Sequence, residues 1–137
     1  MVHALGQAHK LLHPKGLLIN VNDLPTPHPI EVQTPVGVHK VGWIQDRGDF
    51  YETRSAFNAL AQVVGDGDFT LEDQRDFDFN IYIDDLAELV EWLAEWWSSA
   101  ILPDNIFRQI EALMREASQP ARIVLGLRVR MIVLRAV

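Results

Sequence analysis

The side chains that could support metal or acyl-transfer chemistry are few and poorly spaced for it. His9 and His13 stand one helical turn apart, a spacing at which two imidazoles can share a metal ion. No third ligand follows at a metal-binding spacing, and Pro14 closes the turn, so we expect no zinc or iron site. The chain contains no cysteine, which excludes disulfides and thiol nucleophiles. It also lacks a Gly-x-Ser-x-Gly motif and a Gly-Lys-Ser/Thr phosphate loop.

Two carboxylates, Asp76 and Asp78, alternate along an acidic stretch in the manner of an acid/base pair. Arg128 and Arg130 repeat the same alternation near the end of the chain. Opposite charges across an antiparallel ladder are favourable by about 0.2 to 1 kcal/mol. The sequence therefore predicts structural ion pairs that fix which strands are neighbours, and a basic patch for an anionic ligand is the second choice.

Trp92 and Trp96 lie four residues apart on the flank of a predicted helix over residues 86–100, beside several glutamates. An exposed tryptophan pair in an acidic setting predicts a substrate lid or a subunit contact. Packing of both rings against the following helix is the alternative.

The element that must position most of these groups is one long strand over residues 121–136. Its odd positions are apolar and its even positions mix aliphatic residues with arginine, which is typical of an interior strand. Residues 68–83 also alternate between apolar and polar side chains, except near residues 73–75, where the alternation is interrupted. They predict a strand that pairs antiparallel with the strand at residues 121–136.

Shorter elements complete the predicted layout. A helix over residues 1–12 has no residue ahead of it that could act as an N-cap, a hint that the chain was cut from a longer one. The apolar residues 17–21 predict a buried strand. Residues 22–29 contain three prolines and predict an unpaired extended loop. Residues 30–33 and 38–44 predict a hairpin. Further helices are predicted between the Asp49 cap and residue 65, and at residues 86–100 and 105–117, with Asp49, Asp85 and Asp104 as their N-caps.

Length and composition indicate one domain over residues 1–137, with 48% hydrophobic residues to form its core. A formal net charge of −7 argues against non-specific binding to nucleic acid or to anionic membranes. No apolar run approaches the roughly 18 residues that span a bilayer. We expect a cytoplasmic protein without membrane or nucleic-acid partners.

The segment from Ala8 to Val21, with its leucine-rich helix, Pro14-Lys15-Gly16 turn and apolar strand, resembles part of the class I, Rossmann-like methyltransferases that use S-adenosylmethionine. It is similar to the helix, turn and fifth strand in the C-terminal half of that domain. The resemblance implies an α/β fold with a three-stranded mixed sheet, in which strand 121–136 lies antiparallel between strands 17–21 and 68–83. Helices would cover the faces of the sheet, and residues 30–44 would form a small hairpin insertion.

The same resemblance implies a function and its limits. The family's glycine-rich cofactor turn belongs to the missing N-terminal half, and Gly65-Asp66-Gly67 is better explained as a helix cap, so we expect no cofactor-binding residue in this chain. The chain would be the substrate-side portion of a methyltransferase, inactive in isolation. The residues expected to face a substrate are Asn22, Asp23, His28, Trp92 and Trp96, although a surface loop rich in turns would have the same composition around residues 22–28.

A strand at residues 17–21 without its family neighbour would leave an apolar open edge. We therefore expect a homodimer or a swapped oligomer, formed through that edge or through the Trp92 and Trp96 flank. The alternative is a small stand-alone α+β module for binding or oligomerisation, without catalytic activity.

Overall fold

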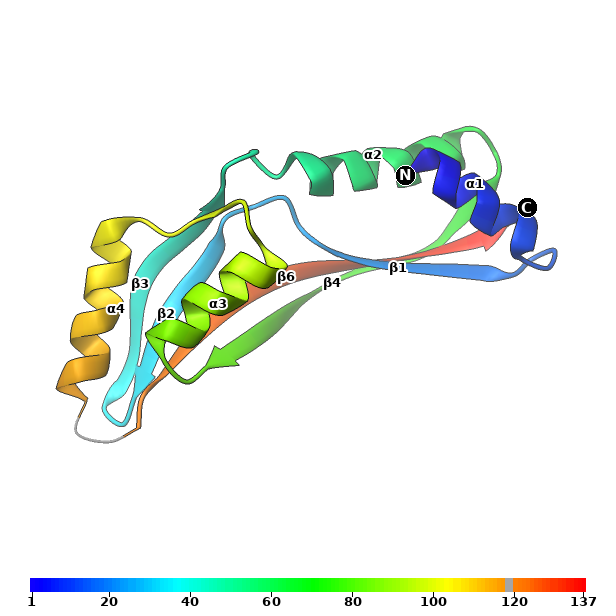
Figure 1. Cartoon of the computed structure of the whole chain (residues 1–137). Coiled ribbons are helices and arrows are strands. Elements are labelled where there is room, and N and C mark those ends of the chain that lie inside the picture. The colour runs from blue at the N-terminus through cyan, green and yellow to red at the C-terminus, as the bar shows by residue number, and fades with distance from the viewer. Residues whose placement is uncertain (118–119) are drawn as a thin grey trace. The chain divides into compact units, whose positions relative to one another are not determined.

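The computed structural model describes residues 1–117 and 120–137 (Figure 1). Within these residues the chain forms four helices and a six-stranded sheet. Contacts divide it into two compact units. The first unit comprises Met1–Pro25, Phe50–Phe77 and Arg128–Val137, and the second comprises Thr26–Asp49 and Asp78–Leu127. Two long strands, β4 (Phe69–Ile83) and β6 (Arg122–Ala136), contribute residues to both units.

The interior position predicted for β6 is confirmed by its pairings. It pairs antiparallel with β1 (Leu17–Asp23) through residues 129–135 and with β2 (His28–Thr34) through residues 122–125, and it also pairs with β4. Its odd-numbered Ile123 and Leu125 enter the core of the second unit, and its even-numbered Ile132 and Leu134 enter that of the first. Side chains alternate along a strand, so one aliphatic strand serves two cores.

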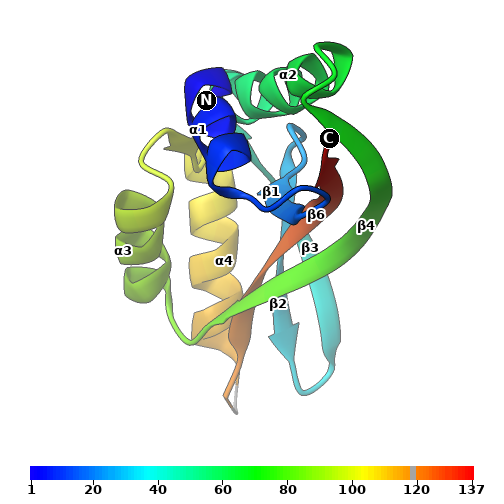
Figure 2. The same cartoon turned by 90° about the vertical axis from the view of Figure 1, so that its right-hand side faces the viewer.

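In the first unit, α1 (Val2–Leu11) and α2 (Tyr51–Gly65) lie side by side (Figure 2). They pack with β1, β4 and β6 around a core made of Leu5, Ala59, Leu60, Val63, Phe69, Ile132, Leu134 and Ala136. The predicted glycine cap of α2 is confirmed. Gly67 adopts φ +83°, its N–H donates to the Val64 carbonyl, and the Asp68 N–H donates to the Val63 carbonyl. These two bonds satisfy carbonyls that the helix end leaves without partners.

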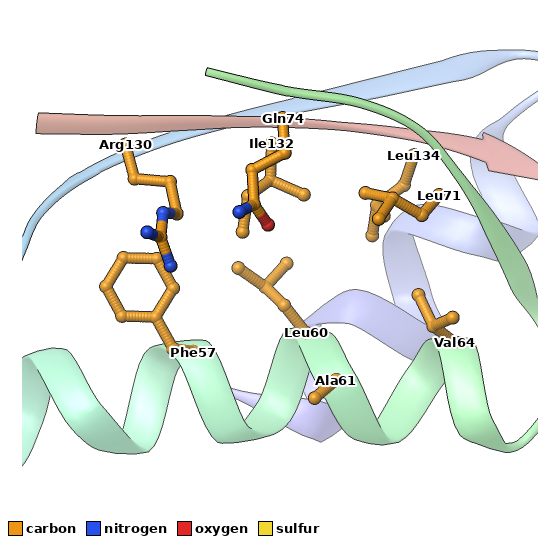
Figure 3. A pocket seen from close by; sticks show the side chains of 9 residues that line it. All are labelled: Phe57, Leu60, Ala61, Val64, Leu71, Gln74, Arg130, Ile132 and Leu134. Atoms are coloured by element: carbon orange, nitrogen blue, oxygen red, sulfur yellow. The ribbon is translucent and has the colours of Figure 1, made fainter. Parts of the chain in front are cut away.

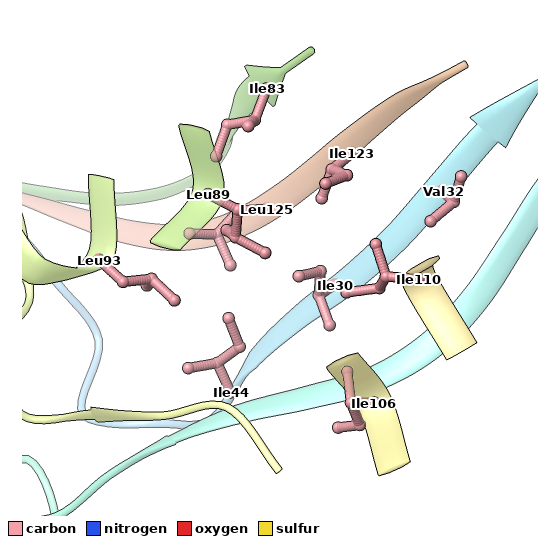
Figure 4. Packing of buried hydrophobic residues seen from close by; sticks show 10 residues of the cluster. All are labelled: Ile30, Val32, Ile44, Ile83, Leu89, Leu93, Ile106, Ile110, Ile123 and Leu125. Carbon is pink, nitrogen blue, oxygen red and sulfur yellow. The ribbon is translucent and has the colours of Figure 1, made fainter. Parts of the chain in front are cut away.

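In the second unit, β2 and β3 (Gly37–Asp46) form the predicted hairpin, and β5 (Ala100–Ile101) pairs with the end of β3. Helices α3 (Leu86–Trp96) and α4 (Asp104–Glu116) contribute to a second core. Figure 4 shows these side chains converging between the strands and the two helices: Ile30, Val32, Ile44, Ile83, Leu89, Leu93, Ile106, Ile110, Ile123 and Leu125.

The predicted three-stranded mixed sheet is too small. The expected neighbours of β6, β1 and β4, are present, but the hairpin also joins the sheet, with Ile30 opposite Leu125 and Val32 opposite Ile123. All four pairings with a defined register in the described residues are antiparallel. The hairpin pairs because the start of β6 offers it backbone groups and an apolar face, which a sequence pattern does not reveal.

The prediction of an unpaired loop over residues 22–29 is wrong at both ends. Asn22 and Asp23 extend β1, where they lie opposite Arg130 and Val129. His28 belongs to β2, opposite Ile44. Only residues 24–27 remain between the two strands. The three prolines each remove one backbone N–H donor, but the neighbouring residues keep theirs, so pairing continues on either side of the loop.

One of the three predicted N-caps is confirmed. The Asp85 carboxylate accepts a 2.8 Å hydrogen bond from the Glu88 N–H at the start of α3. Asp49 does not cap α2, because Phe50 occupies the N-cap position with φ +57° and makes no side-chain cap bond. Asp104 is the first residue of α4 rather than its cap. Helix α3 also ends at residue 96, earlier than predicted, because Ala100 pairs with β3.

Candidate functional site

A pocket of about 380 Å³ lies within the first unit, between α2 and the strands β4 and β6 (Figure 3). This volume is at the small end of the range of about 300 to 1,000 Å³ that is typical of small-molecule sites. The pocket is lined by Phe57, Leu60, Ala61 and Val64 from α2, Leu71 and Gln74 from β4, and Arg130, Ile132 and Leu134 from β6.

Helical and strand periodicity place these residues on facing surfaces. The α2 residues are separated by three, one and three positions, which keeps them on one side of the helix. Residues 130, 132 and 134 alternate along β6 and share a face. Leu71 and Gln74 are an odd number of positions apart, so β4 is irregular between them, close to the predicted lapse at residues 73–75. There the Asp73 carboxylate accepts from the Gln74 N–H at 2.9 Å and from Arg75 Nε at 2.8 Å.

The charged end of the pocket is an ion pair between two strands. Arg130 Nε donates to Asp76 Oδ1 at 2.7 Å, and Arg130 Nη2 donates to Asp76 Oδ2 at 2.9 Å, which confirms this predicted cross-strand pair. The hydrogen bond from Arg130 holds the pKa of Asp76 below its usual value, and the charges of Arg130 and Arg128 act in the same direction. The same hydrogen bond raises the pKa of Arg130. The pair uses two of the five N–H donors of the guanidinium and leaves three for another acceptor.

The pocket is amphipathic along its length. Figure 3 shows the Arg130 guanidinium beside the Phe57 ring at one end, with Leu71, Val64 and Leu134 gathered at the other. The Arg130 Cζ atom lies 5.9 Å from the centroid of the Phe57 ring, the outer limit of a cation–π contact. Leu60 and Leu134 are buried, whereas Leu71 is 54% exposed. An apolar chain with a hydrogen-bond acceptor at one end would therefore match the lining.

Two of the predicted substrate-facing residues lie in the first unit, near this charged end. Asn22 is half-buried and directly opposite Arg130 in the ladder between β1 and β6, so both side chains are on the same face of the sheet. Its amide nitrogen donates to Asn20 Oδ1 at 2.8 Å. Asp23 ends β1 and is exposed, opposite Val129. Their role toward a substrate stays a prediction.

The other three predicted residues belong to the second unit, so the structure does not gather the five into one unit. His28 is only 2% exposed, and its ring packs edge-on against Trp97 with 5.0 Å between centroids. Trp92 packs partly buried against the second core, as the packing alternative expects, whereas Trp96 is 69% exposed.

Trp97 also takes part in a polar contact that the sequence did not indicate. Its indole N–H donates to Asp46 Oδ1 at 2.8 Å, and the Ser99 hydroxyl donates to the same oxygen. The Arg47 N–H donates to the Ser99 carbonyl at 2.8 Å. These bonds tie the end of β3 to the segment after α3, so we interpret the cluster as structural.

None of the residues that line the pocket was predicted from the sequence to face a substrate, including its polar or aromatic members Phe57, Gln74 and Arg130. The available signal was the pair of arginines at alternate positions near the end of the chain, which also allowed a basic patch for an anion. What the sequence could not supply is the distance between α2 and β6, since it depends on how the strand twists beneath the helix.

Within residues 1–117 and 120–137, no group of three or more His, Asp or Glu side chains comes together in a way that could hold a metal ion. None of the helices in this part of the chain combines the length and the hydrophobicity needed to cross a membrane. Comparisons with protein-family models, with curated proteins and with solved structures found no match.

Proposed function

We propose that this chain is the substrate-side, C-terminal portion of a Rossmann-like, S-adenosylmethionine-dependent methyltransferase domain. The observation that carries the proposal is the arrangement around β6. This strand pairs antiparallel with β1, with Val21 opposite Met131, and it also pairs with β4. The order β1, β4, β6 along the chain, with β6 paired to both, corresponds to the fifth, sixth and seventh strands of the family that residues 8–21 resemble.

The surface of β1 supports the same proposal. Among the described residues β1 pairs only with β6, which leaves its second edge without a strand partner. Three of its alternate side chains are strongly exposed: Leu17 at 47%, Ile19 at 62% and Val21 at 53%. An open edge beside an apolar face favours pairing with another polypeptide. In the methyltransferase family, a further strand from the cofactor-binding half occupies this position.

The residues of this chain do not fit the cofactor itself. Its one closely spaced glycine pair, Gly65 and Gly67, closes α2 through the hydrogen bonds of a helix cap, so those backbone groups are already engaged. We therefore infer that a second portion of the domain holds S-adenosylmethionine. The 137-residue chain would support the sheet and supply substrate-facing groups such as Asn22 and Asp23. Its contribution would be to position a substrate, which is a large part of the catalysis of a bimolecular transfer.

The test compares two chains by calorimetry. The 137-residue chain is expected to give no binding heat with S-adenosylmethionine, whereas a chain extended by the in-frame upstream coding sequence is expected to bind it. That upstream sequence should encode a strand followed by a glycine-rich turn. Tight binding by the 137-residue chain, or an upstream sequence without such a turn, would contradict the proposal.

Self-association of the isolated chain follows from the same open edge. We infer a two-fold homodimer or a swapped oligomer through β1, since two identical edges can pair with each other. Sedimentation velocity should show a dimer, and Val21→Lys should restore a monomer. Val38→Lys, at a 56% exposed position in the second unit, is the matched control. If Trp96→Ser dissociates the dimer and Val21→Lys does not, the interface is the Trp92 and Trp96 flank. A monomer at high concentration would contradict both.

A second candidate function is a stand-alone module for binding or oligomerisation. It is favoured by the hairpin of β2 and β3, which pairs with β6 and builds a separate core with α3 and α4. This arrangement requires no parallel strand and no missing half. Absence of an upstream glycine-rich turn, together with a stable dimer, would select this function over the first.

A further inference from the structure

We propose that the pocket between α2 and the strands β4 and β6 binds a short-chain aliphatic monocarboxylate. The carboxylate would lie on Arg130, and the hydrocarbon tail would run toward Val64 and Leu134. This ligand site uses the face of the sheet that α2 covers, and it depends on neither the methyltransferase proposal nor the open edge of β1.

The tail is specified by the walls of the pocket. Six of its nine lining residues are aliphatic: Leu60, Ala61, Val64, Leu71, Ile132 and Leu134. Leu60 on α2 and Ile132 and Leu134 on the facing strand β6 are at most 7% exposed and form the buried walls, while the 54% exposed Leu71 marks the open side. A volume of about 380 Å³ suits a chain of a few methylene groups rather than a large ring system. Each CH₂ that becomes buried should tighten binding about fourfold.

The head group is specified by hydrogen-bond donors. Arg130 keeps three N–H donors after its two bonds to Asp76, and a guanidinium has no acceptor to offer, so the ligand must supply an acceptor. The planar donor fork matches a carboxylate. The Gln74 amide can add a donor from β4, and no acidic residue is among the lining residues in the described part of the chain.

Asp76 does not cancel this preference. A carboxylate bound to the free side of the guanidinium would lie nearer to the positive charge than to Asp76, and attraction at the shorter distance outweighs repulsion at the longer one. An ammonium head group would be repelled by the guanidinium of Arg130, which offers donors and no acceptor.

Methyl-resolved NMR titration with sodium hexanoate is the direct test. Saturable shifts are expected for the methyl groups of Leu60, Val64 and Leu134, with no shift at Ile110 in the second core. Butanoate, shorter by two methylene groups, should bind about 15-fold more weakly. The four tryptophans all belong to the second unit, so tryptophan fluorescence should not respond.

Variants separate the head from the tail. Arg130→Met should weaken hexanoate at least tenfold while changing the binding of 1-hexanol by less than about twofold. The double variant Arg130→Met/Asp76→Asn should behave in the same way, and it removes the unpaired carboxylate that could disturb folding. Val64→Phe should block both ligands by filling the tail end of the pocket, where Val64 points toward Leu134 (Figure 3). Arg122→Met, on the same strand but in the second unit, is the matched control and should leave binding unchanged.

Three results would overturn the proposal. The first is unchanged hexanoate affinity in both Arg130 variants. The second is hexylammonium binding as tightly as hexanoate. The third is a set of shifts that spreads over both units without saturating.

Discussion

Replacing Phe69 with alanine tests whether the two units unfold as one domain. Phe69 begins β4, is only 1% exposed, and packs in the first core with the His9 ring edge-on at 5.1 Å between centroids. Truncating a buried phenylalanine costs about 3 to 5 kcal/mol. With a urea slope of about 2 kcal/mol per molar, a loss of about 4 kcal/mol lowers the unfolding midpoint by about 2 M.

The assay uses two probes that report on different regions. Tryptophan fluorescence reports only on the second unit, which contains Trp43, Trp92, Trp96 and Trp97, whereas far-UV circular dichroism reports on all four helices. Because β4 and β6 contribute to both units, we expect both probes to show the same lowered midpoint in Phe69→Ala. The distant substitution should therefore be visible to the tryptophans.

Phe77→Ala is the matched control, since it removes the same ring from the same strand in the same unit. Phe77 is 42% exposed, so its loss should cost less than about 1 kcal/mol and shift the midpoint by less than about 0.5 M. A fluorescence midpoint that stays at the wild-type value while the dichroism transition splits would refute cooperative unfolding. A shift below about 0.5 M for Phe69→Ala in both probes would refute the packing argument.

Two further predictions concern charge and backbone. Asp76 has a folded-state pKa below its usual 3.8, so its pair with Arg130 stabilises the protein above that pH and loses this effect as the pH falls through the folded pKa. Asp76→Asn should therefore lower the urea midpoint at pH 7 and lower it progressively less as the pH falls below 3.8, and a loss that does not shrink with falling pH would contradict the pairing. Gly42→Ala should destabilise by about 1 to 3 kcal/mol, because φ is +156° and a Cβ would meet the buried Ile106 Cδ1 at 2.7 Å. Gly6→Ala, in α1 with nothing within 4 Å, should instead stabilise by about 0.5 to 1 kcal/mol, and thermal unfolding of both variants would check the contrast.

Alternation and spacing along the chain were enough to predict much of the sheet. The aliphatic run at residues 121–136 is an interior strand, and the matching positions of Asp76 and Asp78 with Arg128 and Arg130 predicted cross-strand ion pairs, of which the structure shows that between Asp76 and Arg130. Local chemistry also located the glycine cap at the end of α2 and the Asp85 cap of α3. These features depend on residues close together in the chain or on the alternation of side chains along a strand, and a sequence displays both directly.

Other features depend on where distant segments meet. Pairing of the hairpin with β6 rests on backbone hydrogen bonds, which carry almost no side-chain signal. Phe50 rather than Asp49 precedes α2, because the path out of β3 decides where that helix begins. The pocket beside Arg130 was likewise beyond the sequence, since its size depends on the spacing between α2 and β6. The sequence by itself determined the two long strands, the Asp85 cap of α3, the glycine cap of α2 and the opposite charges that pair across β4 and β6. Only the tertiary structure decided which strand edges became occupied and where space remained between helix and sheet, because both depend on contacts between residues far apart in the chain.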